Sequence, residues 1–208
     1  VSPDAARLLG LSPHALFDEP LKGWLSGDRR LPGSEAVAMC YAGHQFGHFV
    51  PQLGDGRAIV LGELQGADAA HWEIQLKGAG LTPFSRDGDG RAVLRSTIRE
   101  YLCSEAMHGL GIPTTRALCL FDSDEEVYRE RIERGALLVR LAPSHVRFGS
   151  FEFFSHRQQF ARVKQLADYV IAHDYPALQE QAAPYLSLLQ EVVKRTARLM
   201  AQWQLVGF

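Results

Sequence analysis

The chain has 208 residues, of which 46% are hydrophobic and 22% are charged. This length can bury one substantial core or two small ones, as in an ordinary globular protein. The formal net charge of −2 provides no overall positive field, which argues against a nucleic-acid-binding protein. Any polyanion must therefore be bound by a local cluster of basic side chains. No apolar run is long enough to span a membrane, so no membrane association is predicted.

The three cysteines, Cys40, Cys103 and Cys119, are widely spaced in apolar surroundings. An odd number in this pattern predicts free, buried thiols rather than a disulfide framework or a zinc site. Free thiols are typical of a reducing compartment, and the first residues do not resemble a signal peptide, so we predict a cytoplasmic protein. The chain begins with Val and ends in the apolar run QLVGF, and we expect it to be a piece of a longer protein.

The first forty residues mix short helical patterns with turn residues, and their elements are not assigned. Two strands are predicted over residues 57–64 and 71–78. The second has apolar side chains at positions 72, 74 and 76 and polar ones between them. This alternation is typical of a strand with one buried face, and the two strands are expected to pair in antiparallel fashion. A glycine-rich loop over 78–90 then leads into a helix within residues 91–111.

Two further strands are predicted over 115–121 and 136–142, joined by an acidic turn at 122–126. Beyond Pro143 the pattern becomes helical. Ser155 and Gln158 fit a capping box that begins one helix, and Pro184 begins another. We therefore expect an α+β protein in two parts: a β-rich part with one central helix over residues 1–145, and a helical part over 146–208. A ligand cleft is expected between them.

Lys77 ends its predicted strand on the polar side, and Glu100 lies inside the following helix. Protein kinases use a strand lysine and a helix glutamate in this way to hold nucleotide phosphates. The alternative is an exposed lysine at a strand edge and a solvated glutamate. The sequence alone leaves both interpretations open.

Two glycine clusters and two arginines are further candidates for an anion site. Residues 54–57 (GDGR) and 87–91 (DGDGR) precede a strand and a helix, where backbone amides can approach phosphates. For residues 54–57 the alternative is a hairpin turn, because the third glycine of a kinase glycine-rich loop would fall at Ile59. For residues 87–91 the alternative is a plain loop. Arg140 and Arg147 flank the expected cleft, where they can reach a terminal phosphate or form surface ion pairs.

His44 and His48 have the spacing of a helical metal site. The glutamate of the HExxH motif is absent, however, and Gly43 and Gly47 oppose a helix. We therefore expect a packed structural segment rather than a metal site.

Three long segments resemble one family in order and spacing. YAGHQFGHFVPQLGDGRA, IQLKGAGLTPFSRDGDGRAVLRSTIREYLCSEAMHGLGIPTTRAL and VRLAPSHVRFGSFEFF are similar to the selenoprotein O family of kinase-fold protein adenylyltransferases. The resemblance runs essentially end to end. It implies a protein-kinase-like fold, in which residues 1–145 form an N-terminal extension and an antiparallel-sheet N-lobe and residues 146–208 begin a helical C-lobe that is incomplete.

The resemblance also implies the chemistry. Family members bind ATP in an orientation flipped relative to kinases, use Mg²⁺, and transfer AMP to Ser, Thr or Tyr hydroxyls of protein substrates. It implies that Glu100 positions Lys77. The residues expected to contact ATP are Gly54, Gly56, Arg57, Lys77, Asp89, Gly90, Arg140 and Arg147.

The family's catalytic loop and its metal-binding aspartate are expected just after Phe208. No catalytic residue or metal ligand is therefore assigned within this chain, and these 208 residues are expected to be inactive alone. The competing hypotheses are a kinase-like phosphotransferase and a non-catalytic nucleotide-binding module, and a nucleic-acid-binding module is the weakest. The sequence predicts neither the protein substrates nor the oligomeric state.

Overall fold

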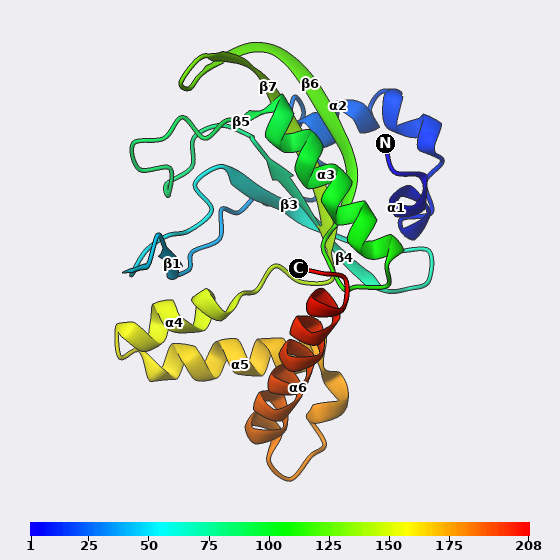
Figure 1. Ribbon diagram of the computed structural model, residues 1–208. Coiled ribbons are helices and arrows are strands. Elements are labelled where there is room, and N and C mark those ends of the chain that lie inside the picture. Colours follow the sequence, from blue (N-terminus) through cyan, green and yellow to red (C-terminus); the bar gives the residue numbers. More distant parts are fainter.

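The computed structural model describes residues 1–208, and the chain has an α+β fold (Figure 1). In chain order the elements are α1 (Pro3–Leu8), the 3-10 helix η1 (Pro13–Phe17), α2 (Leu21–Ser26), β1 (Gly43–Gln45), β2 (His48–Val50), β3 (Ala58–Gln65), β4 (His71–Lys77), β5 (Ala92–Val93), α3 (Leu94–Gly109), β6 (Arg116–Tyr128), β7 (Ile132–Ala142), α4 (Phe148–His156), α5 (Phe160–Asp174), the 3-10 helix η2 (Pro176–Leu178) and α6 (Pro184–Leu205).

Five strands form one antiparallel sheet around β7. Strands β4 and β5 pair one after the other with one edge of β7, β6 pairs with its other edge, and β3 extends the sheet beyond β4. The predicted antiparallel pairing of the first two long strands is confirmed. Along β4, Ile74 and Leu76 point into a core on one face of the sheet, so Gln75 and Lys77 point to the other.

The N-terminal helices cover the apolar face of the sheet. Residues from α1, η1 and α2 pack against residues from β3, β4, β6 and β7; this core comprises Ala5, Ala6, Leu16, Leu25, Leu61, Ile74, Leu76, Leu118, Cys119, Val139 and Leu141. Each of these helices has only five or six residues. Helices this short do not complete the apolar repeat by which a sequence indicates a helix, so the sequence pattern does not reveal them.

The predicted central helix is α3, which lies across the sheet (Figure 1). Glu105 of α3 accepts hydrogen bonds from the Arg116 side chain of β6 at 2.9 and 2.8 Å and from the Ala117 N–H at 3.0 Å. Arg116 is almost completely buried. This ion pair therefore fixes the position of the helix on the sheet.

The hairpin of β6 and β7 is longer than predicted. The acidic residues 122–126 do not form the turn but lie within β6, at a bulge between Asp122 and Glu126. The actual turn is at residues 129–131. Arg134 of β7 pairs with Asp122 at 2.6 Å and with Asp124 at 3.3 Å, so a cross-strand cation allows an acidic segment to remain extended.

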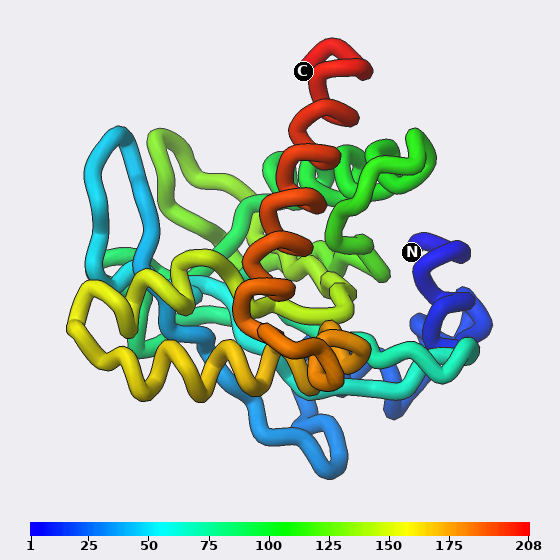
Figure 2. Tube along the Cα trace, turned by 90° about the horizontal axis from the view of Figure 1, so that it is seen from below, coloured from blue at the N-terminus to red at the C-terminus, as the bar shows by residue number.

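The predicted capping box at Ser155 is wrong. Ser155 lies near the end of α4, Gln158 has a φ of 56° in the turn that follows, and α5 begins at Phe160. The sequence FGSFEFFSH forms α4, which packs beside α5 (Figure 2). The predicted start of α6 at Pro184 is confirmed. The apolar side chains of Leu186, Leu189, Val193 and Met200 on α6 are exposed.

The cysteines are free, as predicted, but not all of them are buried. Cys119 is buried, and burial raises the pKa of its thiol to about 12. Cys103 is exposed, which contradicts the prediction. His44 and His48 lie in the β1–β2 hairpin rather than on a helix. None of the helices has the length and hydrophobicity that a transmembrane span requires.

A histidine cluster joins the sheet to α5. The imidazole of His173 lies 3.0 Å from a carboxylate oxygen of Glu63 in β3 and 2.9 Å from Asp174. His71 of β4 contacts the other oxygen of Glu63, and Tyr169 stacks on His173. The hydrogen bond to Asp174, and then that to Glu63, raise the pKa of His173 above its usual range.

This raised pKa predicts a pH-dependent stability. His173 should contribute fully to the free energy of unfolding below about pH 6.5, the pKa of histidine in an unfolded chain. That contribution should be lost as the pH rises through the higher pKa that His173 has in the folded protein. The thermal midpoint of His173→Gln should therefore fall further below wild type at about pH 6 than at about pH 8.5. His14→Gln, at an exposed histidine without an ion pair, is the control. A difference independent of pH would contradict this role.

Candidate functional site

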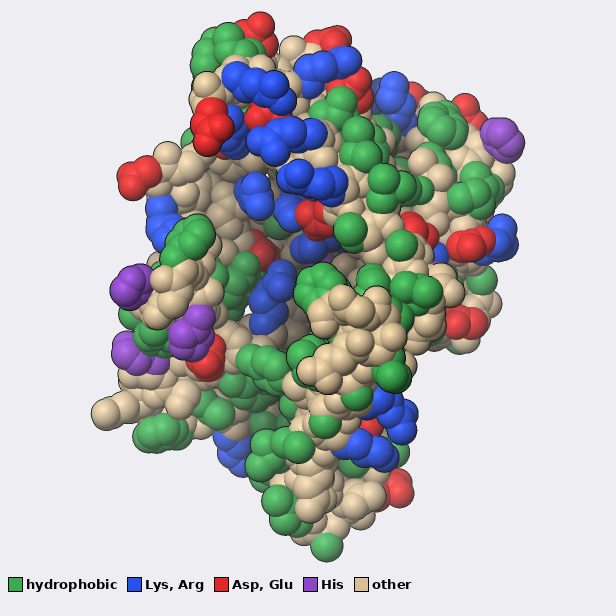
Figure 3. Space-filling view, viewed as in Figure 1, with side chains coloured by type: hydrophobic (Ala, Val, Ile, Leu, Met, Phe, Trp, Pro, Cys, Tyr) green, Lys and Arg blue, Asp and Glu red, His purple; other side chains and the backbone are tan.

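A pocket of about 470 Å³ opens where the turn before β3, the loop over 78–91, the strands β4 and β7 and the start of α4 meet. Seven basic residues line it, and they outnumber its two acidic residues, Asp55 and Asp89. The basic residues are Arg57, Lys77, Arg86, Arg91, Arg129, Arg140 and Arg147. Figure 3 shows lysine and arginine side chains gathered around a hollow between the sheet and the helices. The pocket is thus locally positive, although the net charge of the whole chain is −2.

The structure brings all the sequence-predicted contact residues into this one pocket, from five separate segments. They are Gly54, Gly56, Arg57, Lys77, Asp89, Gly90, Arg140 and Arg147. Glu100 is not part of the lining but lies directly behind it on α3.

Lys77, Glu100 and Arg140 form one charged cluster. The Lys77 ammonium donates to one oxygen of Glu100, and Arg140 donates to the other oxygen at 3.0 Å. Burial lowers the pKa of Lys77, and the Glu100 carboxylate partly opposes that shift. Because two cations share one carboxylate, a net positive charge remains beside the pocket.

The loop over 78–90 packs tightly, both against the turn that carries the first glycine cluster and on itself at the second. An added Cβ on Gly54, whose φ is 63°, would lie 2.3 Å from the Phe84 ring, and one on Gly90, whose φ is 71°, would lie 1.9 Å from the carbonyl oxygen of Gly80. Thr82 and Ser85 donate side-chain hydrogen bonds, both 2.6 Å long, to the carbonyls of Asp55 and Gly56. The loop over 78–90 is thereby fixed against the turn before β3.

Asp89 is already paired with a residue that the sequence did not indicate. Both of its carboxylate oxygens accept from Arg129, at 2.7 and 3.0 Å, and one also accepts from the Arg91 N–H at 2.9 Å. The Arg129 hydrogen bonds hold the pKa of Asp89 down at about 2. Arg129 lies in the turn of the β6–β7 hairpin, which thus reaches back to the pocket.

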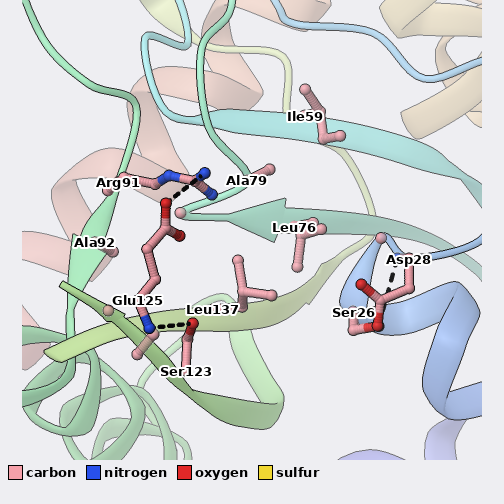
Figure 4. Close-up of a pocket in the computed structure, with 14 residues that line it drawn as sticks. Ser26, Asp28, Ile59, Leu76, Ala79, Arg91, Ala92, Ser123, Glu125 and Leu137 are labelled. Atoms are coloured by element: carbon pink, nitrogen blue, oxygen red, sulfur yellow. Dashed lines mark hydrogen bonds and ion pairs between the residues drawn. The ribbon is translucent and has the colours of Figure 1, made fainter. Parts of the chain in front are cut away.

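Arg91 connects this pocket to a smaller cavity of about 310 Å³, lined by residues that include Leu76 and Leu137 (Figure 4). The Arg91 guanidinium pairs with Glu125 at 2.8 Å. Apart from Arg91, this cavity presents two carboxylates, Asp28 and Glu125, so it lacks the positive excess of the larger pocket.

The residues of the larger pocket do not fit a Mg²⁺ site. Asp55 lies 3.6 Å from the guanidinium of Arg147, and Asp89 is held by Arg129. No group of three or more histidine, cysteine, aspartate or glutamate side chains is arranged to hold a metal ion. The pocket can bind and orient a polyanion through cations and backbone amides.

Sequence reasoning missed several polar residues that line the pocket, among them Tyr41, Asp55 and Arg129, and it missed Gln75 behind the pocket. In the sequence Asp55 is only the residue between two glycines, and Gln75 is one of the polar residues of its strand. The position of Gln75 between Glu73 and Lys77 on the polar side of β4 was an available signal. No local pattern indicates Tyr41 or Arg129, because their roles depend on contacts distant in sequence.

Comparison with known proteins supports one family. The family model described as "Protein adenylyltransferase SelO" matches residues 2–208. The chain is 63% identical to the "Protein nucleotidyltransferase YdiU" of Thioalkalivibrio sulfidiphilus over 98% of its length, 61% identical to that of Thiobacillus denitrificans over 100%, and 58% identical to that of Klebsiella pneumoniae subsp. pneumoniae over 98%. It spans 42% of the length of each of these relatives. The chain belongs to the SelO family of protein adenylyltransferases.

Proposed function

We propose that this pocket binds ATP and that the natural full-length protein transfers AMP from ATP to Ser, Thr or Tyr hydroxyls of other proteins. The observation that carries the proposal is the convergence of Lys77, Arg140 and Arg147 on one pocket that both glycine clusters also line. A triphosphate is the common cellular anion whose charge matches such a cluster. Family membership supplies the reaction class.

In this proposal the sheet and α3 form a kinase-like N-lobe within residues 1–145, and residues 146–208 begin the C-lobe. Lys77, oriented by Glu100, neutralises phosphate oxygens, and Arg140 and Arg147 hold the terminal phosphate of a nucleotide bound in the flipped orientation. That placement leaves the α-phosphorus open to attack by a substrate hydroxyl. The new P–O bond forms as the bond between the α- and β-phosphates breaks and pyrophosphate leaves. The glycines allow the backbone to approach the phosphates closely.

Proton removal and Mg²⁺ binding are assigned to groups outside these 208 residues, which we propose are inactive alone. Mg²⁺ would supply charge neutralisation at the phosphates. We place the protein in the cytoplasm, where ATP is available and free thiols stay reduced.

Two other functions use the same residues. A kinase-like phosphotransferase would present the γ-phosphate instead, since the Lys77–Glu100 pair serves either orientation. A non-catalytic module would bind ATP without transferring any group. Because Arg140 shares Glu100 with Lys77, a second cation lies beside the lysine and can hold the terminal phosphate, as the flipped orientation requires.

Binding is tested by thermal stability of the natural full-length chain with and without Mg-ATP. A ligand at about a hundred times its Kd should stabilise the fold by roughly 2.7 kcal/mol. Lys77→Ala should lose most of this stabilisation, whereas Lys22→Ala, at an exposed lysine of α2, should keep it. Absence of any stabilisation in wild type would contradict ATP binding.

The reaction is tested with ATP labelled on either the α- or the γ-phosphate. Only the α-label should become attached to protein, and the Arg140→Ala, Arg147→Ala double variant should reduce its transfer by about a hundredfold or more, as for other lost transition-state contacts. Attachment of the γ-label alone would identify a phosphotransferase. Unchanged transfer by the double variant would remove the two arginines from the mechanism.

The close packing within the loop over 78–90 is tested with Gly90→Ala. A methyl group there would meet the Gly80 carbonyl, so the loop must shift and ATP affinity should fall by roughly tenfold or more. Gly109→Ala adds the same methyl group where no atom lies within 4 Å and should bind ATP as wild type does. Equal ATP affinities in the two variants would show that the loop contact is not required.

A further inference from the structure

We propose that Asp55 and Gln75 are positioning residues that together fix Arg140 and Arg147 for the phosphates of the nucleotide. The inference rests on the proposed function, in which those two arginines contact phosphate. Asp55 and Gln75 belong to a buried polar network behind the pocket, and this network sets the direction of both guanidinium groups.

Asp55 is 4% exposed and lies between the two glycines of the turn before β3. Its carboxylate accepts from the Tyr41 hydroxyl at 2.9 Å, the Met39 N–H at 3.4 Å and the Gln75 amide at 3.3 Å, and lies 3.6 Å from Arg147. A buried carboxylate is costly unless it is hydrogen-bonded and paired. This one meets both conditions, and its only cationic partner is a pocket arginine.

Gln75 transmits the influence of Asp55 to the second arginine. It is completely buried and sits opposite Arg140 in the β4–β7 ladder. Because its NH₂ group donates to Asp55, its carbonyl oxygen faces Arg140 and accepts from that guanidinium. If the Gln75 amide were reversed, its NH₂ group would face the Arg140 guanidinium and its oxygen would face the Asp55 carboxylate, so neither hydrogen bond could form. The charge on Asp55 therefore determines which end of the Gln75 amide Arg140 meets.

Each arginine is held from two sides. Arg140 donates to Glu100 at 3.0 Å and to Gln75, and its side chain is 15% exposed. Arg147 lies over the Tyr41 ring, 4.8 Å from its centre, and beside Asp55. Tyr41 is itself fixed by Asp55, and burial followed by the Asp55 charge raises the pKa of its hydroxyl to about 12. One buried carboxylate thus acts on both arginines, directly on Arg147 and through Gln75 on Arg140.

The test uses the natural full-length chain and measures Kd for ATP and for AMP by calorimetry, with the thermal midpoint of each variant. Asp55→Asn should weaken ATP binding by roughly tenfold, the size of one lost charged hydrogen bond. AMP binding should change much less, because AMP lacks the phosphates that the arginines hold. In an Arg140→Ala, Arg147→Ala background the same substitution should have no further effect, since its influence passes through those side chains.

A rescue separates positioning from a general effect on folding. In the Asp55→Asn, Gln75→Glu double variant the carboxylate moves to position 75, where it accepts from the amide at position 55 and from Arg140. ATP affinity should recover in part, although Arg147 remains without its partner. If Asp55→Asn does not fold, Gln75→Met serves instead, because it cuts only the Arg140 branch and should cost less ATP affinity.

Three results would overturn the inference: wild-type ATP affinity in Asp55→Asn and Gln75→Met, equal losses for ATP and AMP, or an undiminished loss in the arginine-free background. These results are distinct from failure of the proposed function, in which the wild-type chain itself does not bind ATP.

Discussion

The site depends on one electrostatic constraint: several cations must be kept together around a pocket without being neutralised. Glu100 meets this constraint by accepting from both Lys77 and Arg140, so one carboxylate holds two positive groups in place and leaves a surplus. Like charges this close repel one another, and the low polarity around them strengthens that repulsion. The fold compensates with rigidity, since the lysine lies on β4, the arginine on β7 and the glutamate on α3.

The antiparallel register is what makes that cluster possible. β4 and β7 pair so that Gln75 is opposite Arg140 and Lys77 is opposite Leu138. A shift of one residue would turn Lys77 and Gln75 toward the core formed by the N-terminal helices and bring Ile74 and Leu76 to the pocket. The same alternation that buries the apolar side of β4 therefore fixes where its polar side chains point. Core packing and site geometry are two results of one register.

The sequence predicted most of the sheet and the central helix because both have clear periodic patterns. It also indicated Lys77, Glu100 and the arginines, since family resemblance marks them individually. It missed the extent of β6, because an acidic run such as residues 122–126 is typical of a turn unless a cross-strand arginine balances it. It misplaced the start of α5, because the Ser155 pattern that resembles a helix start lies in the last turn of another helix. The network through Asp55 was not predicted at all, because its partners come from three separate segments.

The N-terminal helices lie away from the larger pocket, but the sheet that carries the pocket needs them as a cover. None of their residues lines the larger pocket, yet they cover the apolar side of the sheet. The Ser2 N–H donates to the Leu118 carbonyl at 2.8 Å, and its hydroxyl donates to Glu105 at 2.5 Å. A shorter chain that began at β3 would expose the side of β4 that carries Ile74 and Leu76 to water, and exposed apolar surface of that kind promotes aggregation. The N-terminal helices therefore support the pocket indirectly, by covering the opposite face of the sheet that carries Lys77.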